Sequence, residues 1–203
     1  MKSAQRFFNF GRRFANLAKL LSGVNLKEVG SANAGASNAT ISLGWKYGIL
    51  VALIDIGKGV LAILLLRAYL LNSSFTLEQS SILLYIIGAG VILGHNFPIH
   101  MKFQGGKGTA SLIGIFIALN WEIGSIALLA LIIVALLSNY LIIGILVFYI
   151  FFGITVFFIE PTIWPFIIVV LLFLIALSLH LENINRLRLG EEPKVTSAFK
   201  KSK

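Results

Sequence analysis

A short glycine-rich stretch around one lysine carries the clearest chemical signal in this sequence. Residues 105–109 read Gly-Gly-Lys-Gly-Thr and lead into an apolar run that predicts a helix. Glycines let backbone N–H groups converge on an anion, a helix N-terminus adds partial positive charge, and Lys107 adds a full charge. It is not a Walker A loop, because Met101 stands where that motif has its first glycine. A flexible loop whose lysine only follows the chain topology is the alternative. The residues predicted to hold phosphate here are Gly105, Gly106, Lys107 and Gly108.

Three further polar clusters lie next to apolar runs. Residues 30–38 read Gly-Ser-Ala-Asn-Ala-Gly-Ala-Ser-Asn, a composition that suits turns and exposed N–H groups. Residues 94–98 read Gly-His-Asn-Phe-Pro, and residues 180–187 read His-Leu-Glu-Asn-Ile-Asn-Arg-Leu. No Gly-x-Ser-x-Gly nucleophile elbow occurs, and Ile99 stands four residues after His95, where an acyltransfer dyad would have Asp. The histidines lack neighbours at metal-ligand spacing, so we expect no metal site at His95, His100 or His180.

Two charged residues stand within the first apolar segment. Asp55 and Lys58 are three residues apart and therefore lie on one helical face. Charges inside a membrane segment suggest function by default, but a mutually neutralising pair that fixes helix packing is the interpretation we favour. Arg67, further along the same segment, is expected to extend toward the far interface.

The composition places these clusters in a membrane protein. The chain has 203 residues, of which 58% are hydrophobic and 12% are charged, against about 25% charged in a typical soluble domain. A soluble domain and a disordered chain are therefore excluded, and the absence of cysteine removes thiol chemistry and disulfides. The fold class that follows is an all-α integral membrane protein with six transmembrane helices. These are predicted at 48–71, 80–97, 109–119, 123–137, 140–159 and 162–180.

The N-terminal region differs from these spans. Residues 7–21 contain several phenylalanines and leucines but also Arg12, Arg13 and Lys19, which are costly inside a bilayer. We expect an amphipathic helix on the membrane surface rather than a signal peptide. The predicted organisation is thus a basic N-terminal segment with the Gly/Ser/Asn loop (1–47), a transmembrane bundle (48–180) and a basic cytoplasmic tail (181–203).

The basic residues support this topology. The net charge is +9, and of the 17 Lys and Arg residues all except Lys58 and Arg67 fall on the side that holds both termini. The opposite loops carry Glu78, Glu122 and Glu160. Positive loops face the cytoplasm, so both termini and the polar clusters are predicted to be cytoplasmic, and the charge is not a sign of nucleic-acid binding.

Taken in order, the motifs resemble the bacterial acyl-phosphate:glycerol-3-phosphate acyltransferase family (PlsY type), from about Phe14 to Glu192. Residues 30–38 look like its first motif, Gly-Ser-Gly-Asn-x-Gly-Ala-Thr-Asn, and Asp55-x-x-Lys58-Gly59 looks like its continuation. The stretch from Gly94 to Gly108 is similar to its second motif, and residues 180–187 look like its His-x-x-Asn-Ile-x-Arg.

This resemblance implies a multi-pass enzyme of the bacterial plasma membrane that acts in phospholipid biosynthesis. The enzyme would transfer a fatty acyl group from acyl phosphate to the 1-hydroxyl of glycerol 3-phosphate without a metal or other cofactor. The family has seven helices, so the segment before residue 47 would be a degenerate first helix. By carry-over, the catalytic residues are Ser31, Asn33, Lys107, His180 and Asn183; Ser37 and Asn38 join the phosphate-binding residues; and His95, Asp55, Lys58 and Arg186 support the site.

Two family arginines are absent. Ile41 stands three residues after the first motif, where the family has arginine, and Asn139 replaces the arginine of an Arg-Tyr-x-Ser-x-Ser-Ser motif. Lys46 and Arg186 are the residues that could replace the lost charge. The alternatives are a catalytically impaired relative that binds lipid precursors or partners an active enzyme, and, ranked last, a small transporter. The sequence leaves the oligomeric state open.

Overall fold

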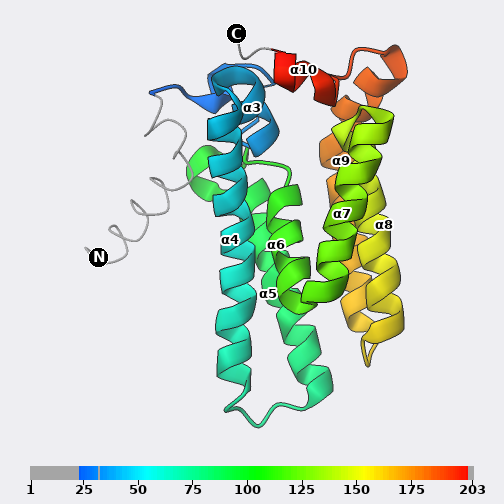
Figure 1. The fold of residues 1–203 in the computed structure, drawn as a ribbon. Helices are drawn as coiled ribbons and strands as arrows, with labels where there is room; N and C mark the ends of the chain where they lie inside the picture. The colour runs from blue at the N-terminus through cyan, green and yellow to red at the C-terminus, as the bar shows by residue number, and fades with distance from the viewer. Residues whose placement is uncertain (1–22, 32, 201–203) are drawn as a thin grey trace, which may run out of the picture.

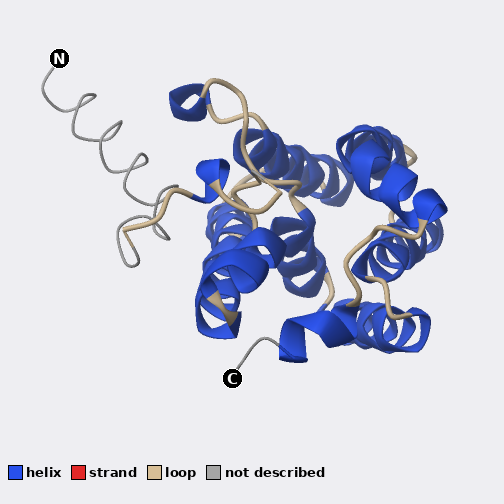
Figure 2. Cartoon of the chain, turned by 90° about the horizontal axis from the view of Figure 1, so that it is seen from above, coloured by secondary structure: helices blue, strands red, loops and turns tan. Residues whose placement is uncertain are grey.

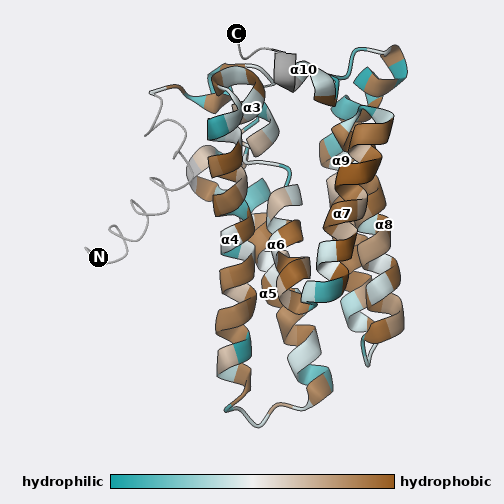
Figure 3. Ribbon diagram, in the orientation of Figure 1, coloured by the Kyte–Doolittle hydropathy of each residue, from teal (hydrophilic) through white to brown (hydrophobic). Residues whose placement is uncertain are grey.

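The computed structural model describes residues 23–31 and 33–200, and all regular structure in this part of the chain is helical (Figures 1 and 2). Five helices are long and apolar enough to cross a membrane: α4 (Trp45–Leu70), α5 (Leu77–Asn96), α7 (Trp121–Ser138), α8 (Leu141–Ile159) and α9 (Trp164–Leu189). A sixth apolar helix, α6 (Thr109–Leu119), is shorter. The six apolar segments are therefore found as predicted, and most residues along these helices are apolar (Figure 3). The expected surface helix at 7–21 lies outside the described residues.

Local signals in the sequence explain where several helices begin and end. Thr76 and Gln79 form a reciprocal capping box at the start of α5, and the Asn120 side chain accepts the N–H of Ile123 at the start of α7. Gly190, with φ 72°, ends α9. Helix α9 thus continues nine residues beyond the predicted span end at His180, and it carries Asn183 and Arg186 on a rigid helix rather than in a tail.

Helix α6 forms the centre of the bundle. Every residue from Ser111 to Phe116 is buried, in keeping with a helix that is apolar on all sides. It approaches α4 closely at Gly59 and Gly114, where a methyl group would meet Ser111 O at 2.5 Å and Ile56 O at 2.1 Å respectively. Because only glycine fits there, the start of α6 is held in a fixed place beside α4.

Arg67, on α4, caps the C-terminal end of this central helix. Its guanidinium donates to the carbonyl oxygens of Ala118 (2.7 Å) and Leu119 (2.6 Å), the last residues of α6. Terminal carbonyls of a helix have no partner within the helix, so a short helix that ends inside a bundle needs such a donor. The expectation that Arg67 extends toward the far interface was therefore wrong.

The polar clusters gather at one end of the bundle, the upper end in Figure 1. The short helices η1 (Leu26–Glu28), α3 (Ala36–Leu43) and α10 (Val195–Lys200) lie there, together with the loop before α6 and the end of α9. Gly44, with φ 97°, breaks the chain between α3 and α4 and lets α3 fold back on α4. The topology thus brings four segments far apart in sequence to one boundary.

Candidate active site

The glycine-rich loop is fastened to the end of α5. A 3-10 turn, η2 (Ile99–Met101), reverses the chain after Pro98. The N–H of Gly105 then donates to Asn96 O (2.9 Å), and the N–H of Gly106 donates to His95 O (3.2 Å). These two N–H groups are therefore occupied. In the described part of the chain, the N–H groups of Lys107, Gly108 and Thr109, at the N-terminus of α6, donate no hydrogen bond.

A partly buried group of charged and titratable side chains lies beneath this loop. Lys58 forms an ion pair with Asp55 (Nζ–Oδ1 2.7 Å) and also contacts Nδ1 of His95, which lies 3.4 Å from Asp55 Oδ1. The other ring nitrogen of His95 faces the loop, because a methyl group on Gly106 would come within 2.1 Å of it. The Asp55–Lys58 pair predicted from spacing thus exists, and it orients a histidine on which the loop rests.

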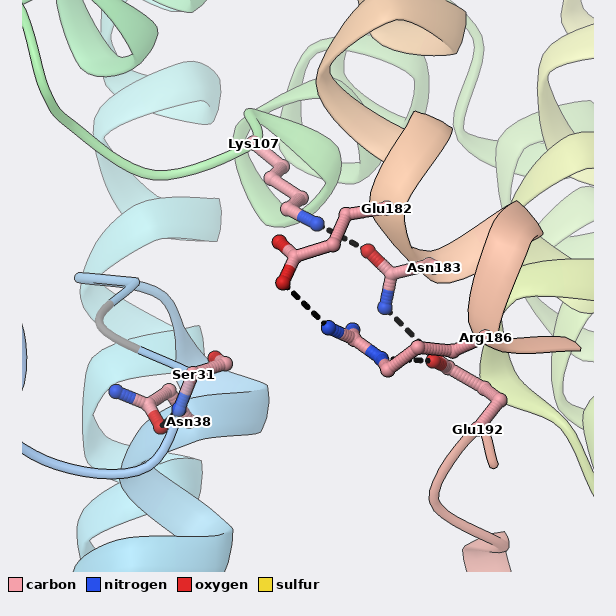
Figure 4. Close-up of polar contacts among 7 residues, drawn as sticks. All are labelled: Ser31, Asn38, Lys107, Glu182, Asn183, Arg186 and Glu192. Carbon is pink, nitrogen blue, oxygen red and sulfur yellow. Dashed lines mark hydrogen bonds and ion pairs between the residues drawn. The ribbon is translucent and has the colours of Figure 1, made fainter. Parts of the chain in front are cut away.

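Lys107 joins the loop to α9. Its ammonium donates a hydrogen bond to the side-chain oxygen of Asn183, so residues 76 positions apart meet at this point (Figure 4). Burial lowers the pKa of the Lys107 ammonium below its ordinary value, while the nearby Glu182 carboxylate opposes that shift. A half-buried cation with a lowered pKa gains from the approach of a phosphate group.

Arg186 supplies a second cation beside Asn183. Its guanidinium is held between two carboxylates: Nη1 pairs with Glu182 (2.8 Å) and Nε with Glu192 (2.9 Å). The side chain of Glu182 is 71% exposed, whereas that of Glu192 is only 7% exposed. Glu192 also accepts a hydrogen bond from Asn183 Nδ2 (2.6 Å). Asn183 therefore lies between Lys107 and Glu192, with each side of its amide engaged.

The loop at 30–38 is shaped by one buried amide. Asn38 accepts the N–H of Ser31 at its oxygen (2.9 Å), and its nitrogen donates to the carbonyls of Leu26 (2.8 Å) and Asn33 (2.8 Å). It also bonds Val29 O. Because the amide is fully engaged, Asn38 organises the loop. The groups that remain available on this loop are the exposed side chains of Ser31 and Ser37 and the buried side-chain oxygen of Asn33, which has no hydrogen-bond partner among the described residues.

The structure does not place every predicted residue in contact. Figure 4 shows Ser31 and Asn38 together on one side of the site, and Lys107, Asn183 and Arg186 together on the other. No hydrogen bond joins the two groups within the described residues. His180 lies one turn before Asn183 on α9 and its Nδ1 is 2.9 Å from Ala176 O. The backbone oxygen requires Nδ1 to carry the proton, which leaves Nε2 as an acceptor.

Of the two positions that depart from the family pattern, Asn139 has a structural role that spacing alone does not show. Ile41 lies on α3 with 40% of its surface exposed, and the Lys46 ammonium lies over the ring of Trp45. Asn139 ends α7 in the left-handed conformation and binds the C-terminal segment through Thr196. Of the two candidate replacements for the lost charge, Arg186 lies in the site.

Sequence reasoning missed Glu192. It follows the helix-ending Gly190 in a stretch predicted to be a solvated tail, and no spacing marks it as buried. The only available signal was its position shortly after a helix C-terminus that carries two arginines.

Several known proteins share this sequence pattern and fold. The glycerol-3-phosphate acyltransferase family profile matches residues 14–190. Glycerol-3-phosphate acyltransferase 1 of Oceanobacillus iheyensis is 47% identical over 181 residues, covering 89% of this chain and 87% of that protein. Glycerol-3-phosphate acyltransferase 2 of Thermotoga maritima is 32% identical, covering 88% of this chain and 87% of that protein.

Solved structures agree with these matches. PlsY, an integral membrane glycerol 3-phosphate acyltransferase, superposes in its glycerol 3-phosphate form with a TM-score of 0.78 and 30% identity, covering 89% of this chain and 87% of that chain. Its lysophosphatidic acid form gives a TM-score of 0.75 at 29% identity, with the same shares covered. The non-catalytic and transporter alternatives are not favoured by these likenesses. The chain therefore belongs to the glycerol-3-phosphate acyltransferase family and is a membrane acyltransferase.

Proposed function

We propose that the chain transfers a fatty acyl group from acyl phosphate to the 1-hydroxyl of glycerol 3-phosphate, producing lysophosphatidic acid and inorganic phosphate. The observation that carries this proposal is the contact between Lys107 and Asn183, which brings the glycine-rich loop against the polar end of α9. Two cations and a set of unoccupied N–H groups then lie near one another at the boundary of an apolar bundle. That arrangement suits substrates that combine a phosphate group with a fatty chain.

The phosphate groups bind to Lys107 and Arg186. Lys107 contributes a charge, and the N–H groups of Lys107, Gly108 and Thr109 contribute donors at the start of α6. Gly105 and Gly106 act by fastening the loop to α5, and Asp55, Lys58 and His95 support it from below. Each charge-assisted hydrogen bond to phosphate contributes about 1.5–3 kcal/mol.

The acyl transfer itself needs little from the protein. The glycerol hydroxyl oxygen attacks the acyl carbonyl carbon, the bond from that carbon to the phosphate oxygen breaks, and phosphate leaves. The hydroxyl proton passes to a phosphate oxygen of the substrates. Because phosphate is a good leaving group, alignment and positive charge supply most of the catalysis. Ser31, Asn33, His180 and Asn183 orient the acceptor, with His180 Nε2 available to accept a hydrogen bond from a hydroxyl.

The experiment is a direct assay of the purified chain in detergent. Palmitoyl phosphate and glycerol 3-phosphate are supplied, and release of phosphate and formation of lysophosphatidic acid are measured, with Lys107→Ala as the control. We expect both products from the wild-type chain and little of either from the variant. Phosphate release at the same rate in both proteins, or none in either, contradicts the proposal. A His180 variant that binds substrate normally yet loses all chemistry would contradict proton transfer to the substrate.

We place this reaction at the cytoplasmic face of the bacterial inner membrane, with both termini on that side. The placement is supported by the basic residues at the end of the bundle that carries the site. The chain contains no cysteine, so single cysteines report topology without background. In intact cells, a membrane-impermeant thiol reagent should label Glu78→Cys and not Glu191→Cys. The reverse pattern would contradict the orientation.

A further inference from the structure

The segment that follows α9 folds back beside the end of this helix and is fastened at both of its ends. This segment, 190–196, is called the strap below. Its first part is bound to the end of α9, where the N–H groups of Glu191 and Glu192 donate to Arg186 O (2.8 and 3.2 Å). Its last part is bound to Asn139, in the turn between α7 and α8. The strap therefore links the C-terminal end of α9 to the α7–α8 turn at the same end of the bundle.

The attachment at Asn139 consists of three hydrogen bonds. The backbone oxygen of Asn139 accepts the N–H of Val195 (2.9 Å), and its side-chain oxygen accepts the N–H of Thr196 (3.0 Å). Its side-chain nitrogen donates to Thr196 Oγ1 (3.1 Å). Asn139 adopts φ 64°, a left-handed conformation that asparagine tolerates better than most residues. This geometry directs both the backbone and the side chain of Asn139 at the strap.

The middle of the strap carries Glu192. Its carboxylate is almost fully buried and accepts from Asn183 Nδ2 (2.6 Å) and Arg186 Nε (2.9 Å). A buried carboxylate must keep such partners, because an unpaired charge in the interior is costly. Without Glu192, Arg186 would retain only the solvent-exposed Glu182 as an ionic partner, and such exposed pairs hold a guanidinium weakly. Glu192 thus fixes the direction of Arg186 and of Asn183.

The chain between Glu192 and the residues bonded to Asn139 is short and conformationally restricted. Pro193 follows Glu192 directly. The proline ring fixes the φ angle of Pro193, and it restricts the preceding residue, Glu192, to an extended conformation. Four residues lead from Glu192 to Thr196. A displacement of Val195 and Thr196 away from Asn139 is therefore expected to displace Glu192 as well.

We infer that Asn139 is a positioning residue: by anchoring the strap, it holds Glu192 against Arg186 and Asn183 and so keeps the phosphate-binding groups in place. This inference rests on the proposed function, because it concerns the acceptor site of that reaction. At the position where the family pattern has a charged residue, this chain instead has a tether that acts on the site through the strap.

The test removes the side chain without straining the backbone. Asn139→Gly keeps the left-handed conformation, whereas alanine would not, and Asn139→Asp keeps the acceptor for the Thr196 N–H. Thr196→Val removes only the hydroxyl. The control is Asn72→Gly, an exposed asparagine in the turn between α4 and α5 at the other end of the bundle. Each protein is assayed for KM and kcat toward glycerol 3-phosphate with palmitoyl phosphate as donor.

The expected pattern is a rise in KM with kcat nearly preserved. Loss of two hydrogen bonds predicts an increase in KM of about three- to tenfold in Asn139→Gly, an intermediate value in Asn139→Asp and no change in Asn72→Gly. Thr196→Val should add less in the Asn139→Gly background than in the wild type. Amide exchange of residues 190–196 should accelerate in Asn139→Gly. The inference is overturned if Asn139→Gly has the wild-type KM, or if only kcat falls in that variant, by about three- to tenfold, while KM stays unchanged.

Amide exchange also separates this inference from the proposed function. If the wild-type chain shows no acyl transfer, the proposed function fails, and the anchor is judged by exchange alone. Unchanged exchange across the strap in Asn139→Gly would then overturn the inference, and faster exchange there with no change at the α4–α5 turn would support it.

Discussion

The Lys107 ammonium and the Asn183 side-chain oxygen form a hydrogen bond that joins the glycine-rich loop to α9 (Figure 4). Neither segment alone would make a phosphate site, because the loop has one cation and the helix end has Arg186 committed to carboxylates. Their contact defines a single boundary at which positive charge and free N–H groups are concentrated.

The fit of Gly106 over His95 can be tested by a single methyl group. Gly106→Ala would place that methyl 2.1 Å from His95 Nε2, so the loop or the buried histidine must move. We expect Gly106→Ala to lower kcat/KM for glycerol 3-phosphate about 100-fold or more, because displacement of a binding group by about 1 Å has effects of this size. Gly90→Ala is the matched control, since nothing lies within 4 Å of the added methyl. Equal activity in the two variants would contradict the prediction.

The lowered pKa of Lys107 predicts a particular pH dependence. As pH rises through that pKa, the ammonium loses its proton, and its attraction for phosphate is lost. KM for glycerol 3-phosphate should therefore begin to rise at a lower pH than an exposed lysine would allow. Lys107→Arg should move this alkaline limb upward, because guanidinium stays protonated over the accessible range. Initial rates across an alkaline pH series give KM as a function of pH for the wild type and for Lys107→Arg. If KM rises over the same pH range in both proteins, Lys107 is not the cation that binds the phosphate.

Substitution of Ile41 tests whether restoring the positive charge of the family pattern improves substrate binding. It lies on α3, partly exposed, at the place where the family pattern has arginine. Ile41→Arg is expected to lower KM for glycerol 3-phosphate by about tenfold, which corresponds to one additional charge-assisted hydrogen bond. Ile41→Gln, of similar size and without charge, should leave KM near the wild-type value. Equal KM values for the arginine and glutamine variants would show that the charge does not reach the substrate.

Arg67 should matter for stability rather than for catalysis. Arg67→Gln shortens the side chain and leaves the carbonyls of Ala118 and Leu119 without their donor. We expect a loss of about 2–6 kcal/mol in unfolding free energy, at about 1–3 kcal/mol for each of the two carbonyls. The measurement is thermal unfolding in detergent, with Lys27→Gln, on the other end of the molecule, as the control. An unchanged melting temperature with Arg67→Gln would refute the capping role.

Much of this architecture could be predicted from the sequence, for a physical reason. A span in lipid must be both helical and apolar, so the six apolar runs mark the helices directly, and basic residues mark one side. The Asp55–Lys58 pair was likewise evident because helical spacing sets its geometry. These features depend on residues close together in the chain.

The features that were missed depend on distant contacts. Arg67 meets the end of α6, and Asn38 gathers four backbone groups of a preceding loop. Glu192 is buried against Asn183 and Arg186, in a segment that is bonded to Asn139 far away in the sequence. Local sequence could not indicate these partners, since a polar residue near a helix end is solvated in most proteins. Helix α9 was also predicted to end early, because Glu182 and the residues after it are polar although the helix continues.

The most direct test of the central claim is a double-mutant cycle on Lys107 and Asn183, with binding of glycerol 3-phosphate to the purified chain measured by calorimetry. Each single variant, Lys107→Ala and Asn183→Ala, should weaken binding about 10- to 100-fold, as loss of a charge-assisted contact predicts. If the two residues act as one site, the double variant should bind glycerol 3-phosphate little worse than the single variant that binds it less tightly. The coupling free energy between Lys107 and Asn183 should then be about 1 kcal/mol or more. Strictly additive losses, or wild-type affinity in either single variant, would contradict the account.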